Sequence, residues 1–227
     1  MRVPDMKKCI HLMTASILLV IPSCTNTSLQ SANNLLESGD FLAARRIYAK
    51  IAQKRPQSFE AHFGLGMTYS AEAMHKTDLS LATPGDWYPA IYHLSRAANL
   101  GTNEKVQQTL AILHFNLGAA YKKRGDADAA IERLEQAVSY DSTLLKAFNL
   151  LGTLHQQKGN LARALMFYRQ TIKLQPAYAK AHFNIGSIAW AQQDFELARV
   201  HFEKALQLEP DNAYFRLWYE KAATRAG

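Results

Sequence analysis

The sequence contains little cysteine and no apolar segment long enough to cross a membrane. Its 227 residues include only Cys9 and Cys24, so the paired cysteines of a structural zinc site are missing. The most apolar segment, 10–21, has 12 residues, whereas a membrane-spanning helix needs about 20. These shortages exclude a disulfide-stapled scaffold and a multi-span membrane protein.

Motifs for catalysis and for nucleic-acid binding are also missing. No glycine-rich phosphate loop is present, because Gly64 and Gly66 lie within a predicted helix. The formal net charge is +7, but the basic residues are mixed with acidic ones, as where Lys122 and Lys123 precede Asp126. Such mixing is typical of solvated helix faces. We therefore expect no enzyme activity, cofactor, metal site, small-molecule substrate or nucleic-acid partner.

The stretch 111–212 instead repeats one pattern three times. Gly118, Gly152 and Gly186 are spaced 34 residues apart, and each follows an aliphatic residue. A small residue lies twelve positions after each glycine, and a large apolar one lies four positions further on; these are Ala130, Ala164 and Ala198, then Leu134, Tyr168 and Phe202. Self-similarity at a fixed period indicates stacked structural repeats.

Each repeat contains two segments of helical apolar periodicity around a short polar break. The breaks are Gly125-Asp126, Gly159-Asn160 and Gln193-Asp194. Glycine suits the end of a helix because it adopts positive φ, and Asp or Asn can cap the next helix. Pro176 and Pro210 then end the second helix of their repeats.

This pattern resembles the tetratricopeptide repeat, W-x2-L-G-x2-Y followed by A-x3-F, A and P. The departures are the missing tryptophan at the first position, and His155 and Ala189 in place of the tyrosine. The resemblance implies an all-α, right-handed superhelical solenoid of antiparallel helix pairs. At one first-helix position the repeats carry His62, His114 and His182, which we expect to pack in the core rather than bind metal.

Five repeats and a terminal helix account for most of the chain. The predicted repeats are 25–58, 59–104, 111–144, 145–178 and 179–212, and a capping helix follows in 213–227. The second repeat carries an insertion after Tyr69, around 73–87, in which Thr83-Pro84-Gly85-Asp86 signals a turn. The insertion is either a specificity element or a tolerated surface loop. Residues 105–110 are expected to extend the first helix of the third repeat.

The first 23 residues form a predicted secretory signal, with Arg2, Lys7 and Lys8 before the apolar segment. Ile21-Pro22-Ser23-Cys24 resembles the lipobox of bacterial lipoproteins, although Pro22 is unusual there. Lipidation of Cys24 would give an outer-membrane lipoprotein facing the periplasm. Ordinary signal cleavage nearby, which would give a soluble periplasmic protein, is the alternative.

The family resemblance also implies a binding surface. In tetratricopeptide proteins the first helices line a concave groove that binds segments of other proteins. The corresponding positions are Phe63, Met67, Phe115, Asn116, Lys123, Lys146, Asn149, Lys180, Phe183 and Asn184. The lysines favour an acidic segment or a C-terminal carboxylate. We therefore expect a lipid-anchored scaffold for a protein partner in envelope complex assembly; a soluble periplasmic chaperone-like adaptor and an accessory subunit of an envelope enzyme are the alternatives.

Overall fold

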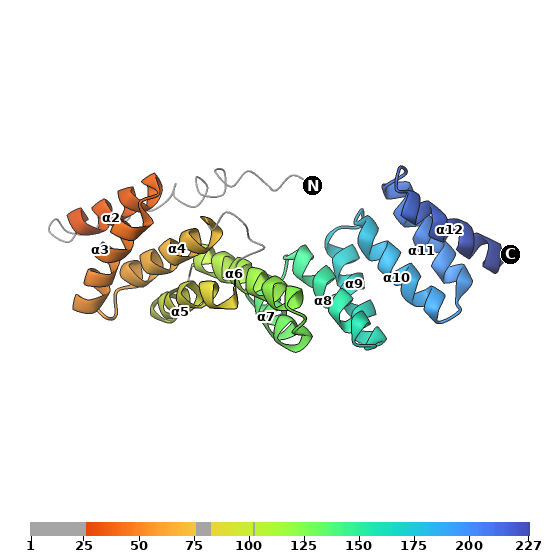
Figure 1. Cartoon of the computed structure of the whole chain (residues 1–227), viewed down its shortest axis with the longest axis horizontal. Coiled ribbons are helices and arrows are strands. Elements are labelled where there is room, and N and C mark those ends of the chain that lie inside the picture. The colour runs from red at the N-terminus through yellow and green to blue at the C-terminus, as the bar shows by residue number, and fades with distance from the viewer. Residues whose placement is uncertain (1–25, 76–82, 102) are drawn as a thin grey trace. The chain divides into compact units, whose positions relative to one another are not determined.

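The computed structural model describes residues 26–75, 83–101 and 103–227 (Figure 1). Over these ranges the fold is all-α, with eleven helices and no strand; they are α2 (Asn26–Ser38), α3 (Phe41–Lys54), α4 (Phe59–His75), α5 (Pro84–Leu100), α6 (Glu104–Lys123), α7 (Ala127–Tyr140), α8 (Leu145–Gln157), α9 (Leu161–Leu174), α10 (Ala179–Ala191), α11 (Phe195–Leu208) and α12 (Ala213–Ala226). None of these helices has both the length and the apolar character needed to cross a bilayer. The predicted signal and Cys24 lie outside the described residues.

The chain forms two compact units, which divide between Gly125 and Asp126. The first unit contains α2–α6 and the second contains α7–α12. Within each unit, helices that follow one another in the sequence pack together, most extensively α4 with α5, α10 with α11, α8 with α9 and α11 with α12. The predicted extension at 105–110 is confirmed, because α6 begins at Glu104 and runs for 20 residues.

The turns within four of the repeats use a residue of positive φ, and in three of these the next residue caps the following helix. Gly125 and Gly159 have φ of 82° and 77°, and Gln193 adopts the same conformation with φ of 64°. The carboxylate of Asp194 then accepts a hydrogen bond from the backbone N–H of Leu197 at 3.0 Å, which caps α11. Gln193 pays the steric cost of a Cβ in this region, a cost that glycine avoids.

Close approach of the two helices in a repeat explains the periodic glycine. A Cβ placed on Gly152 would lie 2.5 Å from Cε1 of Tyr168, well inside contact distance. Tyr168 is fully buried, and its hydroxyl donates a hydrogen bond to Gln156 Oε1 at 2.8 Å. The 34-residue period therefore records a steric requirement, repeated at Gly186 against Phe202.

The last helix covers the end of the second unit, as the sequence predicts. Phe215 of α12 stacks on Phe183 of α10 with ring centroids 4.9 Å apart. Trp218 contacts Trp190 edge to face at 5.5 Å, and the Lys221 ammonium lies 4.8 Å from the Trp218 ring centroid. These contacts bury apolar surface that the final repeat would otherwise expose to water.

The predicted turn at 83–86 is wrong, because these residues begin α5. The Asp86 carboxylate accepts a hydrogen bond from the backbone N–H of Thr83 at 2.8 Å, and Pro84 occupies the first helical position, where its missing N–H costs nothing. Trp87 is 1% exposed and belongs to the core. The part of the insertion in 76–82 lies outside the described residues, so only its helical ends can be placed.

Candidate functional site

Two of the predicted lysines occupy equivalent, exposed positions in the second unit. Lys146 is the second residue of α8 and Lys180 the second residue of α10, one 34-residue period apart. Asn149 and Asn184, further along the same helices, are half-buried. Because equivalent positions of stacked repeats lie on corresponding faces, these side chains place two cations on one face of the unit.

The predicted exposure of Phe63 and Met67 is wrong. Each is only 7% exposed, although the repeat pattern places them on an outward face of α4. The Lys105 ammonium lies 5.8 Å from the Phe63 ring centroid, and Thr109 Oγ1 lies 3.9 Å from Met67 Sδ. Both covering residues belong to the extended first turns of α6, so the added helix length fills the space in which a ligand would bind.

The Phe183 side chain also packs against other aromatic residues of the protein. Its ring is half-buried and lies 5.1 Å from both Phe202 and Tyr214. The remaining predicted residues, Phe115, Asn116 and Lys123, belong to α6 in the other unit, where the first two are half-buried and Lys123 is exposed. The polar residues of α8 and α10 are therefore the predicted set that stays together within one unit.

The histidines form pairs that the sequence pattern did not predict. His62 Nε2–H donates to the carbonyl of Pro56 at 3.2 Å, which leaves its Nδ1 as the acceptor for His93 Nδ1–H at 3.0 Å. Burial, together with the charge that His62 carries when protonated, lowers the pKa of His93 from 6.5 to about 4. The environment of the pair therefore favours the neutral form of His93.

The same arrangement recurs in the second unit. His182 Nε2–H donates to the carbonyl of Pro176 at 3.1 Å, and its Nδ1 lies 3.3 Å from Nδ1 of His201. The pKa of His201 is lowered by burial and further by His182 and Arg169. His62 is buried, as predicted, and His182 is half-buried. Among the described residues no three His, Cys, Asp or Glu side chains are grouped so that they could hold a metal ion.

A cavity of about 270 Å³ lies beside the second histidine pair. It opens between α9 and α11 over α10, and its lining is apolar except for a few polar groups; it consists of Leu165, Arg169, Ile172, His182, Ile185, Ile188, Ala189, Gln192, Leu197 and His201. Sequence reasoning did not predict this cavity. Its signal was Ala189, the small residue that occupies the tyrosine position of the repeat.

Sequence models of known families match along the chain. One model described as "Tetratricopeptide repeat" matches residues 179–212, and a second of the same description matches residues 29–70 and 115–179. Together the matches cover more than half of the 227 residues. The chain belongs to the tetratricopeptide repeat family.

Relatives of this tetratricopeptide repeat chain differ widely in what their names describe. It is 30% identical over 106 residues to "Tetratricopeptide repeat domain-containing protein PYG7, chloroplastic" of Arabidopsis thaliana, covering 45% of this chain and 35% of that protein. It is 30% identical over 190 residues to "Probable UDP-N-acetylglucosamine--peptide N-acetylglucosaminyltransferase SPINDLY" of Hordeum vulgare, covering 81% of this chain and 18% of that protein. The chain spans about a third or less of the length of the curated relatives it matches.

A solved structure of similar size shares the repeat fold. The crystal structure of MamA protein is 25% identical, covers 84% of this chain and 94% of its own, and superposes with a TM-score of 0.53. These likenesses establish the tetratricopeptide repeat fold, while the names of the relatives do not converge on one activity.

Proposed function

We propose that this tetratricopeptide repeat protein is a non-catalytic scaffold that binds a protein partner through the α8–α10 face of its second unit. The observation that carries the proposal is the pair of exposed cations Lys146 and Lys180 at equivalent positions of the two helices. Asn184 on α10 can both donate to and accept from a bound backbone. The partner segment is therefore acidic and extended, or it ends in a free carboxylate.

The proposed cellular setting is the bacterial envelope. The basic residues before the apolar segment 10–21, and Cys24 three residues after its end, support export and lipidation at Cys24. Several acyl chains on one residue anchor a protein stably, because each buried CH2 adds about 0.8 kcal/mol. The scaffold would then act at the periplasmic face of the outer membrane.

The binding proposal is tested by charge reversal with a matched control. A Lys146→Glu, Lys180→Glu variant should lose a stoichiometric partner captured from detergent-solubilised envelopes. A Lys173→Glu, Lys204→Glu variant makes the same charge change at exposed positions of the second helices α9 and α11, and it should keep that partner. We expect at least a tenfold difference in affinity, about 1.4 kcal/mol, between the two variants.

The outcomes separate the scaffold from other functions. Equal capture by both lysine variants would rule out the α8–α10 face as the binding surface. Capture of many unrelated unfolded clients would indicate a chaperone-like adaptor instead. The anchor is tested separately with Cys24→Ala, which should abolish labelling by radioactive palmitate and release the protein from membranes; unchanged labelling would contradict the lipidation site.

A further inference from the structure

The third residue after the repeat glycine has a ring in three other repeats of this chain, where it is Tyr69, Tyr121 or His155. The ring of Tyr69, in α4, stacks on His93 with centroids 5.7 Å apart and planes 3° apart. The Arg45 guanidinium lies over the Tyr69 ring, 5.4 Å from its centroid, and its Nη1 also pairs with Glu72 Oε2 at 2.8 Å. The Tyr69 side chain, which belongs to α4, thus occupies the space between α3 and α5.

The second unit shows the same filling in its α8–α9 repeat. His155 takes the ring position, is buried, and stacks on Phe167 with centroids 5.4 Å apart and planes 15° apart. One period further along, the corresponding residues are Ala189 and His201. The alanine supplies no ring, so His201 lacks the stacking partner that its equivalents Phe167 and His93 have, and the cavity occupies that place.

The geometry points to an aromatic side chain of a partner protein, tyrosine or phenylalanine, as the occupant of this cavity, stacked on His201 in the place of the missing ring. The inference goes beyond the proposed function because it concerns a different face of α10. The volume of about 270 Å³ is sufficient, since an apolar cavity of about 150 Å³ accommodates benzene. The aliphatic lining, including Ile185 and Ile188, provides the dry surface that an aromatic ring requires.

The charged lining supports a ring rather than an aliphatic chain. In this repeat Leu165 takes the position of Arg45. Arg169 lies one helical turn after Leu165, and both residues line the cavity. It has no carboxylate partner among the described residues. Its guanidinium is therefore available for the face of a bound ring, as that of Arg45 is for Tyr69. The neutral His201 ring provides the second flat surface.

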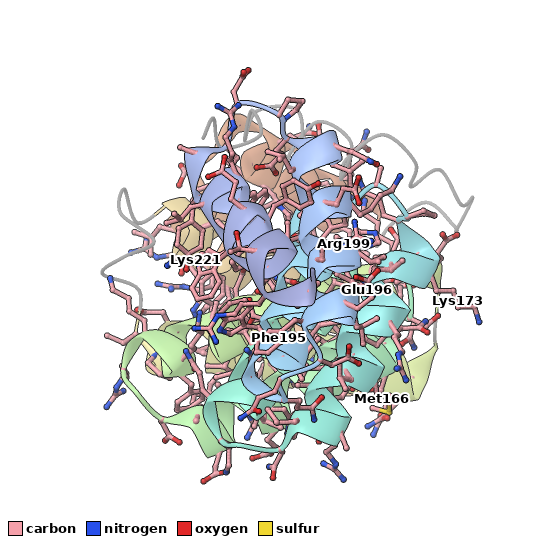
Figure 2. All side chains as sticks on the ribbon, turned by 90° about the vertical axis from the view of Figure 1, so that its right-hand side faces the viewer. Met166, Lys173, Phe195, Glu196, Arg199 and Lys221 are labelled. Carbon is pink, nitrogen blue, oxygen red and sulfur yellow. The ribbon has the colours of Figure 1, made fainter. Side chains whose placement is uncertain are left out.

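The surroundings of the cavity favour a protein partner over a free small molecule. Leu197 lines the cavity and is 42% exposed, and Val200, three residues further on the same face of α11, is 46% exposed. Met166 of α9 is 54% exposed and projects outward from that helix (Figure 2). Exposed apolar side chains beside a cavity with polar groups are typical of protein interaction sites.

The test uses N-acetyl-L-tyrosine methylamide as a minimal partner side chain, with N-acetyl-L-leucine methylamide and free phenol for comparison. Binding to the full chain is followed by the NMR shifts of the Ala189 amide and the His201 ring. Ala189→Tyr fills the cavity from within, as Tyr69 does. Ala191→Tyr is the matched control, because it adds the same side chain at an exposed position of α10.

We expect the tyrosine derivative to shift these resonances in the wild type and in Ala191→Tyr, with at least tenfold weaker binding in Ala189→Tyr. Ala189→Tyr should also raise the melting temperature. If it does not fold, Ala189→His supplies the smaller ring found at His155, and it should block binding in the same way. The lysine reversals on the α8–α10 face should leave this binding unchanged, so a failure here is distinct from a failure of the proposed function.

Three outcomes would overturn the inference. Equal binding of the leucine derivative would show that the cavity accepts any apolar group. Binding of phenol with exclusion of the tyrosine derivative would assign the cavity to a small molecule. No shift in the wild type at tens of millimolar of the tyrosine derivative would show that the cavity takes no ring from outside.

Discussion

Acid is expected to destabilise the first unit through His93, because this residue titrates differently in the folded and unfolded chain. Its pKa is about 4 when folded and 6.5 when unfolded. Below pH 6.5 His93 is therefore protonated in the unfolded chain but stays neutral in the folded unit. The free energy of unfolding falls as the pH is lowered toward 4. Above pH 6.5 His93 is neutral in both states, so this acid-dependent loss of stability is absent.

The magnitude follows from the shift and from the solvation of the ring. At pH 4.5 the unfolded pKa lies two units above the pH, which corresponds to at most about 2.7 kcal/mol. His93 is only half-buried, and solvent screens part of this cost. We therefore expect protonation of His93 to lower the free energy of unfolding between pH 7 and pH 4.5 by about half of this upper limit.

Urea unfolding at the two pH values measures the effect. Trp87, the only tryptophan of the first unit, reports its unfolding when Trp190 and Trp218 are replaced by phenylalanine. His93→Phe retains a ring against Tyr69 but cannot titrate. The variant costs about 1–3 kcal/mol at pH 7, because the buried Nδ1 of His62 loses its donor.

The decisive quantity is the change in unfolding free energy between the two pH values. It should be smaller in His93→Phe by about 1 kcal/mol, whereas His201→Phe in the other unit should leave the Trp87-reported change as it is in the wild type. An equal acid-induced loss in the wild type and in His93→Phe would refute the reasoning. The acid sensitivity would then belong to the carboxylates.

Three further predictions concern the stability of the second unit, each measured by chemical unfolding. Gly152→Ala should destabilise it by about 1–3 kcal/mol, because the new Cβ meets the buried Tyr168 ring at 2.5 Å; an unchanged midpoint would show that the ring moves freely. Gln193→Gly should stabilise it by about 1 kcal/mol by relieving a Cβ at φ of 64°, as the equivalent Gly159 does, and a lower midpoint would contradict this. Removal of 213–227 should lower its stability by several kcal/mol, since Phe215 and its neighbours leave the core; full retention of stability would mean that the cap only covers a surface.

Much of the fold could be predicted because the repeat encodes its contacts locally. The glycine at position 152 and the large residue at 168 are close in sequence, and the requirement that their helices touch is visible as a fixed spacing. The candidate site was harder to predict. Phe63 has the same repeat position as Phe115 and Asn149, which are half-buried, and its burial depends on six extra residues of α6 that lie about 40 positions away.

The sequence by itself determined the helix pairs, their turns and the capping helix. Helix caps, glycines of positive φ and apolar periodicity each depend on residues that are close together in the chain. Only the tertiary structure decided which of the outward positions are open. The α6 extension covers Met67, α12 covers Phe183, and Ala189 leaves a cavity where Tyr69 fills one. Exposure depends on which neighbouring helix reaches a side chain, and that is set by packing between repeats rather than by the pattern within one.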